Sequence, residues 1–181
     1  AEDLNSDPDW TTLSYLSSHD KGLSSRDNLI DQGTTLLLSP GAVQIYYGDE
    51  NARPAGAGQY TSDSMQGSRS DYQWGANPDI LAHWQQLGQF RRNHPAVGAG
   101  QQQDLGENTY ARTWDGNNDG IIDDRVVIKI NGSGDTTIDV SEVFADGTEV
   151  RDAYDGEEAT VNNGTVEFDF DNNVILIEKV Q

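Results

Sequence analysis

Residues 40–50 read PGAVQIYYGDE, an apolar, β-branched and aromatic run that opens with a Pro-Gly breaker and closes with a glycine and two carboxylates. Such a run predicts a short buried strand with acids after its carboxyl end. Upstream, residues 11–16 lead in the same way into Ser-Ser-His-Asp at 17–20. Residues 24–38 between the two runs are long enough for a crossover helix, with a serine at 24 or 25 as its N-cap. The sequence therefore predicts one β-α-β unit.

Polar residues follow both predicted strands. In a parallel unit the two strands point the same way, so these residues should emerge on one face: His19, Asp20, Asp49 and Glu50. On (β/α)8 barrels, active sites are built on the face at the carboxyl ends of the strands.

The pairing of His19-Asp20 with the strand at 36–50 resembles the α-amylase family of glycoside hydrolases, at the seventh and eighth strands of its barrel. With GSRSDYQW at 67–74, the chain is most similar to the periplasmic or secreted bacterial branch. The resemblance implies that the nucleophile Asp and the acid Glu belong to earlier barrel strands, outside this chain. It also implies a partner, the N-terminal remainder of the same enzyme, covalently joined or as a separate chain, without which this piece should be inactive.

The composition excludes several classes of partner. The chain has 181 residues with 31 Asp plus Glu against 11 Lys plus Arg, a formal net charge of −20, which would repel nucleic-acid phosphates and anionic membranes. It has no cysteine, so neither disulfides nor thiolate metal sites can form. No apolar run reaches the roughly 18 residues that a membrane-spanning helix needs.

The hydrophobic period changes near residue 99. Before it, residues 78–93 carry apolar side chains at the spacing of an amphipathic helix, with Pro95 as a stop. After it, short alternating runs are separated by Gly, Asn and Asp turns. We therefore predict an α/β domain over 1–98, the last two βα units of a (β/α)8 TIM barrel, and an antiparallel β-sandwich over 99–181. The strands of the second domain are expected at 109–114, 125–130, 136–140, 149–153, 165–170 and 174–180.

Asp20 is the candidate catalytic residue. A His-Asp pair in isolation is more often a helix cap beside a polar loop residue. The resemblance instead makes Asp20 the counterpart of the third essential carboxylate, which grips the sugar hydroxyls in the oxocarbenium-like transition state, with His19 helping to hold them. For Asp49 and Glu50 it implies a structural role, pairing with basic groups or backbone amides. Successive residues on a strand point to opposite faces, so these two acids should not flank one bond.

Residues 51–77 are expected to form a long ordered loop on the active face. Aromatic faces can stack on pyranose rings, although a tryptophan can equally fill the small core of its own loop. The candidates for sugar contact, in this loop and around Asp20, are cationic or aromatic: His19, Lys21, Arg26, Arg53, Arg69, Tyr72 and Trp74.

Residues 115–124 read DGNNDGIIDD, with oxygen-bearing side chains at alternate positions before a glycine, like the first half of a calcium loop. Where an EF-hand has its bidentate acid this chain has Val126, so an EF-hand is excluded. A long polar hairpin rich in turn formers is the alternative, and the sequence leaves both open. The candidate calcium ligands are Asp115, Asn117, Asp119, the Ile121 carbonyl and either Asp123 or Asp124.

The resemblance thus implies part of a retaining α-amylase, secreted or periplasmic, that hydrolyses internal α-1,4 bonds of starch or glycogen. Two alternatives stay open. One is a related transglycosylase, which product analysis would identify, and the other is a non-catalytic carbohydrate- or calcium-binding module, which upstream catalytic residues would exclude.

Overall fold

The computed structural model describes residues 12–56 and 66–180. The chain forms two compact units, one ending at Gln89 and the other beginning at Phe90. This division lies within helix α3 (Pro78–Asn93), earlier than the boundary after residue 98 expected from the sequence, because the last turn of α3 belongs to the second unit. Among the described residues, no helix is both long and apolar enough to cross a membrane.

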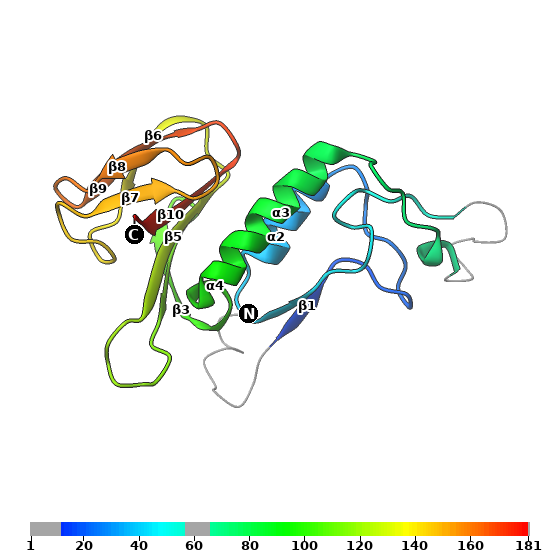
Figure 1. Ribbon diagram of the computed structural model, residues 1–181, viewed down its shortest axis with the longest axis horizontal. Helices are drawn as coiled ribbons and strands as arrows, with labels where there is room; N and C mark the ends of the chain where they lie inside the picture. Colours follow the sequence, from blue (N-terminus) through cyan, green and yellow to red (C-terminus); the bar gives the residue numbers. More distant parts are fainter. Residues whose placement is uncertain (1–11, 57–65, 181) are drawn as a thin grey trace. The chain divides into compact units, whose positions relative to one another are not determined.

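The first unit contains the predicted β-α-β arrangement. Strands β1 (Leu13–Tyr15) and β2 (Ala42–Gln44) pair in parallel, and helix α2 (Leu29–Leu37) connects them (Figure 1). Both strands are shorter than the apolar runs that predicted them. The chain leaves β2 at Gln44 and reaches a turn over residues 47–52, where Gly48 has a positive φ of 88°.

Helix α2 begins later than predicted. Its N-cap is Asn28, which makes no side-chain capping hydrogen bond, rather than Ser24 or Ser25. Residues 24–28 form a bend and a turn instead, because the Ser24 amide donates to the Ser17 hydroxyl at 3.0 Å and Arg26 is drawn to a buried carboxylate. Polar contacts with the preceding loop therefore replace the first helical turn.

Gly33, in the middle of α2, allows α3 to approach closely. A Cβ atom on Gly33 would lie 2.4 Å from Nε1 of Trp84, and the same indole N–H donates to the Leu29 carbonyl at 2.8 Å. Beside it, Nε2 of the buried His83 hydrogen bonds Oγ1 of Thr34 at 2.8 Å. Helices α2 and α3 lie side by side (Figure 1), and Gly33 is a packing requirement between them because a side chain there would overlap Trp84.

The two-stranded parallel sheet exposes apolar side chains. Leu13 is 57% exposed and Tyr15 39%, and Ile45, just after β2, is 47% exposed. Parallel sheets are normally covered on both faces. The described residues of this unit do not provide that cover.

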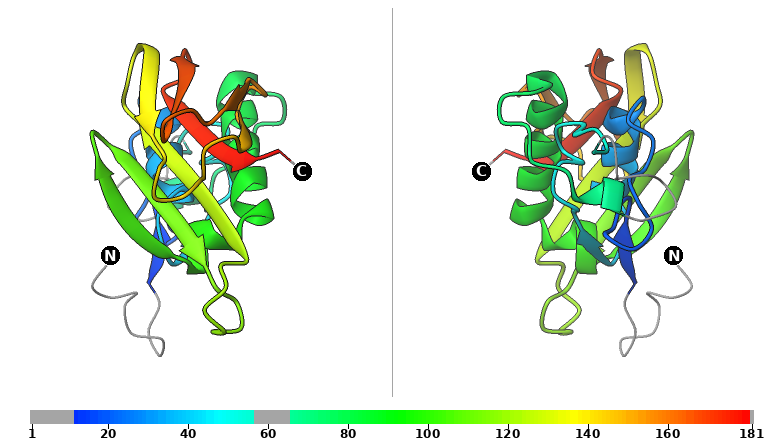
Figure 2. Two further views of the ribbon diagram at one scale, coloured as in Figure 1. Left: turned by 90° about the vertical axis from the view of Figure 1, so that its left-hand side faces the viewer. Right: turned by 90° about the vertical axis from the view of Figure 1, so that its right-hand side faces the viewer.

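The second unit is the antiparallel structure that the change of period predicts. It begins with helix α4 (Pro95–Ala99), and its larger sheet has the strand order β3-β4-β5-β10-β7-β8. In Figure 2 the red β10 runs alongside the yellow-green β5. The larger sheet comprises β3 (Gln101–Gly106), β4 (Thr109–Trp114), β5 (Asp124–Ile130), β7 (Glu149–Asp152), β8 (Glu158–Thr160) and β10 (Val174–Lys179), and the smaller one β6 (Gly134–Asp139) and β9 (Thr165–Phe170).

The two antiparallel sheets share one apolar core. Val127 and Ile175 from the larger sheet belong to the same buried cluster as Ile138 and Phe168 from the smaller one. The alternating burial of β9 shows how the period of two builds this core, since its inward positions are buried and its outward ones exposed.

Asp152 is the more deeply buried of the two carboxylates that the described residues place inside this unit, the other being Glu178. Asp152, at the end of β7, is 1% exposed, and its Oδ1 accepts hydrogen bonds from the amides of Tyr154 and Leu176, both at 2.8 Å. Burial raises the pKa of Asp152 from 3.8 to about 6; the two amides oppose the shift, and the charges of Asp155 and Glu157 add to it.

Candidate active site

The candidate catalytic residue lies on a tight loop that follows β1. The backbones of Ser18 and Gly22 bond each other in both directions at 3.1 Å, which closes the loop. Within it, the Ser18 hydroxyl accepts the amides of Asp20 at 3.3 Å and Lys21 at 3.0 Å. The side chains of His19 and Asp20 are 60% and 76% exposed, with His19 Nε2 3.3 Å from Asp20 Oδ1. Both side chains are therefore open to a ligand.

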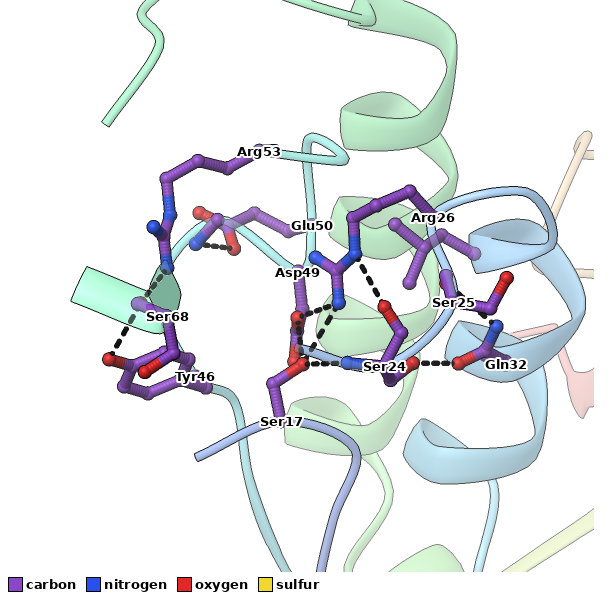
Figure 3. Close-up of polar contacts among 12 residues, drawn as sticks. Ser17, Ser24, Ser25, Arg26, Gln32, Tyr46, Asp49, Glu50, Arg53 and Ser68 are labelled. Atoms are coloured by element: carbon purple, nitrogen blue, oxygen red, sulfur yellow. Dashed lines mark hydrogen bonds and ion pairs between the residues drawn. The ribbon is translucent and has the colours of Figure 1, made fainter. Parts of the chain in front are cut away.

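A buried ion pair lies beneath this loop. Asp49 is fully buried, and its Oδ1 accepts a hydrogen bond from Arg26 Nη2 at 2.8 Å and another from the Ser17 hydroxyl at 2.6 Å. In Figure 3 the Ser17 hydroxyl and the Arg26 guanidinium converge on the Asp49 carboxylate. Arg26, a candidate for sugar contact, is thus occupied within the protein.

Glu50 turns back on its own chain. Its Oε2 accepts the Gly48 amide at 2.8 Å, so both acids are paired as the structural interpretation expects. The reason given from strand alternation is wrong, because Asp49 and Glu50 lie in a turn and not on β2. The turn needs Gly48, where a Cβ would lie 2.4 to 2.8 Å from Arg53 side-chain atoms in addition to the strain of a positive φ.

Arg53 cannot contact sugar, because it is fully buried. Its guanidinium donates to the carbonyls of Tyr47 at 3.0 and 3.1 Å, Ser68 at 2.9 Å and Ser70 at 2.9 Å, and lies 3.9 Å from the centre of the Tyr47 ring. Neutral acceptors thus surround this cation. It links the turn after β2 to the segment that begins with the short 3-10 helix η2 (Gln66–Arg69).

Further donors from this turn, and from Tyr46 just before it, hold this second segment in place. The hydroxyl of Tyr46 donates to the Ser68 carbonyl and that of Tyr47 to the Ser70 carbonyl, each at 3.0 Å. The Asn51 side-chain amide donates to the Gln73 carbonyl at 2.8 Å. The sequence signal for this arrangement is the polar ends of the aromatic pair in the YYGDE stretch, which sequence reasoning treated only as strand residues.

The held segment presents three more sugar-contact candidates: Arg69, Tyr72 and Trp74. Trp74 is 89% exposed and packs edge-on against Tyr72 with ring centres 4.7 Å apart, so it does not fill a loop core. Partial burial and a hydrogen bond with Glu50 raise the pKa of Tyr72. Arg69 is also exposed, and the Ser68 hydroxyl reaches the His19 carbonyl at a long 3.5 Å. Residues 57–65 of the predicted loop lie outside the described residues.

The candidate calcium residues form the exposed β4–β5 connection, and their oxygens accept backbone amides. Asp115 accepts Gly120 N at 2.8 Å, Asp119 accepts Ile121 N at 2.8 Å, and Asp123 accepts Gly116 N at 2.8 Å. Asn117 likewise accepts Asp119 N at 3.1 Å. In the described parts of the chain, no three His, Cys, Asp or Glu side chains are grouped so that they could hold a metal ion.

Asp124 is turned away from that connection. Its Oδ1 lies 2.8 Å from His94 Nδ1, and its Oδ2 accepts the Ala96 amide at 2.9 Å. The other nitrogen of His94 bonds Glu178 at 2.5 Å. Burial by itself would lower the pKa of His94, but the two carboxylates outweigh it and raise the pKa. Of the two alternatives for the last calcium ligand, only Asp123 is left.

Comparison with known proteins places the chain beside α-amylases. No protein-family model matches it. Over 100 residues it is 50% identical to the periplasmic α-amylase of Escherichia coli strain K12, a match covering 53% of this chain and 14% of that relative. The resemblance to the α-amylase family that the sequence predicts is confirmed.

Solved structures show the same fold. The α-amylase of Geobacillus thermoleovorans, complexed with acarbose, matches with a TM-score of 0.69 and 20% identity, covering 94% of this chain and 39% of that chain. An Anoxybacillus α-amylase gives 0.66 and 19%, covering 93% and 38%. The debranching enzyme of Nostoc punctiforme gives 0.60 and 23%, covering 92% and 33%. This mixed α/β chain with its antiparallel sheet therefore corresponds to part of an α-amylase fold.

Proposed function

We propose that this chain is part of a retaining α-amylase that hydrolyses internal α-1,4-glucosidic bonds of starch or glycogen. The observation that carries the proposal is the exposed His19-Asp20 pair on the loop directly after β1, in a chain 50% identical over 100 residues to a periplasmic α-amylase. The name of that relative also supports a secreted or periplasmic location.

In this proposal Asp20 acts on the transition state. Glycoside hydrolysis passes through an oxocarbenium-like state, and hydrogen bonds to ring hydroxyls that strengthen there lower the barrier by several kcal/mol. An exposed carboxylate next to an exposed imidazole can accept such bonds, with His19 as the neighbouring donor. The negative charge of Asp20 would also raise the pKa of a nearby general acid and keep it protonated.

The remainder of the enzyme would supply the nucleophile and the general acid. We propose that β1 and β2 are the last two strands of a (β/α)8 barrel and that the N-terminal remainder, joined or separate, covers them. The exposed side chains of Leu13, Tyr15 and Ile45 support this, because parallel sheets are normally covered on both faces. An isolated chain whose first unit is monomeric and unfolds cooperatively would contradict this part of the proposal.

The α-glucan would lie along the exposed face of the two loops. His19 and Lys21 come from the loop after β1, and Arg69 and Trp74 from the segment held by Arg53. Trp74 offers an apolar ring face for a pyranose. The similar Geobacillus thermoleovorans structure holds acarbose, and a further structure of similar fold, AmyP, was crystallised with maltose; both support a ligand of this class.

Calcium is proposed for the β4–β5 connection, with Asp115, Asn117, Asp119, the Ile121 carbonyl and Asp123 as ligands. Hard oxygen donors suit calcium, and several acids lie close together in sequence here. In the described structure their carboxylates accept backbone amides and are not grouped around one point, so binding would require the loop to rearrange. A bound cation would relieve their mutual repulsion and stiffen the hairpin. Because the loop lies in the second unit, its effect on catalysis would be indirect.

The test is Asp20→Asn in the complete enzyme. The turnover number on maltooligosaccharides should fall by on the order of a thousandfold with folding unchanged, and His19→Ala should cost less. Near-normal turnover of Asp20→Asn would end the assignment. Product analysis would identify a transglycosylase, and a complete protein without hydrolytic or transfer activity would favour a carbohydrate- or calcium-binding module.

A further inference from the structure

One buried hydroxyl closes the base of the loop that carries Asp20. Ser17 is fully buried, and its Oγ accepts the Ser24 amide at 3.0 Å, which joins the two ends of residues 17–24. The same oxygen accepts a hydrogen bond from Arg26 Nη2 at 2.9 Å and donates to Asp49 Oδ1 at 2.6 Å. A hydroxyl has one donor and two acceptor positions, and here all three are used.

The ion pair of Asp49 and Arg26 anchors Ser17 and, through it, this loop. Asp49 is fully buried, the side chain of Arg26 is 19% exposed, and Arg26 Nε also donates to the Ser24 carbonyl at 2.8 Å. Asp49 Oδ2 and Arg26 Nη1 are buried without a hydrogen-bond partner among the described residues. The two charges therefore depend on each other and on Ser17, because a buried charge that loses its partner is strongly disfavoured.

Asp20 has little support of its own. Its side chain is 76% exposed, and its Oδ1 lies 3.3 Å from Nε2 of His19, which is itself 60% exposed and belongs to the same loop. The Ser18 hydroxyl holds only backbone amides of this loop, those of Asp20 and Lys21. The direction in which its carboxylate points is therefore set by the path of the loop. This path begins at Ser17 and ends at Ser24, whose amide bonds the Ser17 hydroxyl. A displacement of about 1 Å in a reacting group can lower a rate by roughly a hundredfold.

We propose that Asp49 and Arg26, acting through the Ser17 hydroxyl, are positioning residues that hold the 17–24 loop so that Asp20 meets the sugar in the transition state. This inference rests on the proposed role of Asp20. It gives Arg26 a role below the loop instead of a contact with substrate, and it makes Asp49 functional without exposure to the ligand.

The experiment uses the complete enzyme with Ser17→Ala, Asp49→Asn and a control, Ser25→Ala. Ser25 lies on the same stretch, but within the described parts of the chain its hydroxyl bonds only to the exposed Asp27. We expect Ser17→Ala and Asp49→Asn to lower kcat on maltoheptaose by about 10- to 100-fold with KM changed less than about twofold. The control should keep both values.

Double variants separate positioning from general damage. In an Asp20→Asn background, adding Ser17→Ala should lower kcat no further, because the residue that it positions has already lost its function. A merely structural role for Ser17 would instead give the same fold-loss in both backgrounds, and this would overturn the inference. If Asp49→Asn fails to fold, the Ser17→Ala pair of measurements decides alone.

The two proposals fail differently. Normal turnover of Asp20→Asn would refute the proposed function itself. A large loss for Asp20→Asn, combined with Ser17→Ala that is folded and as active as Ser25→Ala, would leave the proposed function standing and refute the positioning role.

Discussion

Asp152→Asn should change how the stability of the chain depends on pH. Asp152 is buried, and its pKa is about 6 in the folded state against 3.8 as an ordinary carboxyl. Between these two values the folded state binds the proton more tightly than the unfolded state. Its contribution to stability is therefore fully present below pH 3.8 and is lost as the pH rises through 6. A difference of about two pH units corresponds to about 3 kcal/mol.

Asparagine keeps one acceptor oxygen for the amides of Tyr154 and Leu176 but cannot ionise. We therefore expect the difference in unfolding free energy, variant minus parent, to rise by about 3 kcal/mol between pH 3.5 and pH 7. A difference in unfolding free energy that is the same at every pH reports the replacement of one carboxylate oxygen by the NH2 of the carboxamide. The measurement is urea unfolding followed by circular dichroism across this range. Asp104→Asn is the control, because Asp104 also accepts a backbone amide but is exposed.

A direct titration gives a second assay of the same group. The side-chain carboxyl carbon of Asp152, followed by NMR, should shift with a midpoint near pH 6. A midpoint at or below pH 4, or a difference in unfolding free energy that stays constant with pH, would refute the reasoning that burial controls this carboxyl.

Two further variants test the packing of the first unit and the acidic loop of the second. Gly33→Ala should destabilise the chain by about 1 to 3 kcal/mol in thermal or urea unfolding because its Cβ would overlap Trp84, whereas Gly88→Ala, with open space around its Cβ, should be neutral or stabilising. Asp119→Ala should lower the calorimetric unfolding temperature, and chelator should lower that of the parent but not of the variant. If neither the substitution nor the chelator changes the unfolding temperature, the loop is only a solvated turn. Asp146→Ala is the control for the lost amide hydrogen bond, because Asp146 accepts the Gly164 amide outside this loop.

Periodicity predicted the elements whose burial follows it. Helix α3 and strands β4 and β9 have the expected bounds. In β9 the apolar spacing matches the face that is buried, whereas β4 buries Thr109 and Arg112 beside Ala111. Strand β3 escaped prediction because QQQDLG has no apolar alternation. It forms by pairing with β4, and an edge strand needs only one such partner. Pairing between distant residues is not visible in a local pattern.

The loops around the candidate site were less predictable for a different reason. The motif that resembles α-amylases located Asp20 and predicted that Asp49 and Glu50 are paired within the protein. It did not indicate Ser17, because a serine before a His-Asp pair has no pattern of its own. Its importance comes from its distance to Asp49, 32 residues further along the chain. Arg53 was missed as a buried link because most arginines are exposed.

The polar residues of the first unit divide into two groups by burial, and the division has a functional consequence. Ser17, Asp49 and Arg53 are fully buried and bonded to the chain itself, while Asp20 and Trp74 are exposed. A buried polar group must satisfy its hydrogen bonds inside the protein, so Asp49, although it follows the end of strand β2, is unable to meet a substrate. Substitutions in the buried group should therefore lower stability and turnover together, whereas substitutions of Asp20 or Trp74 should lower turnover at an unchanged unfolding temperature.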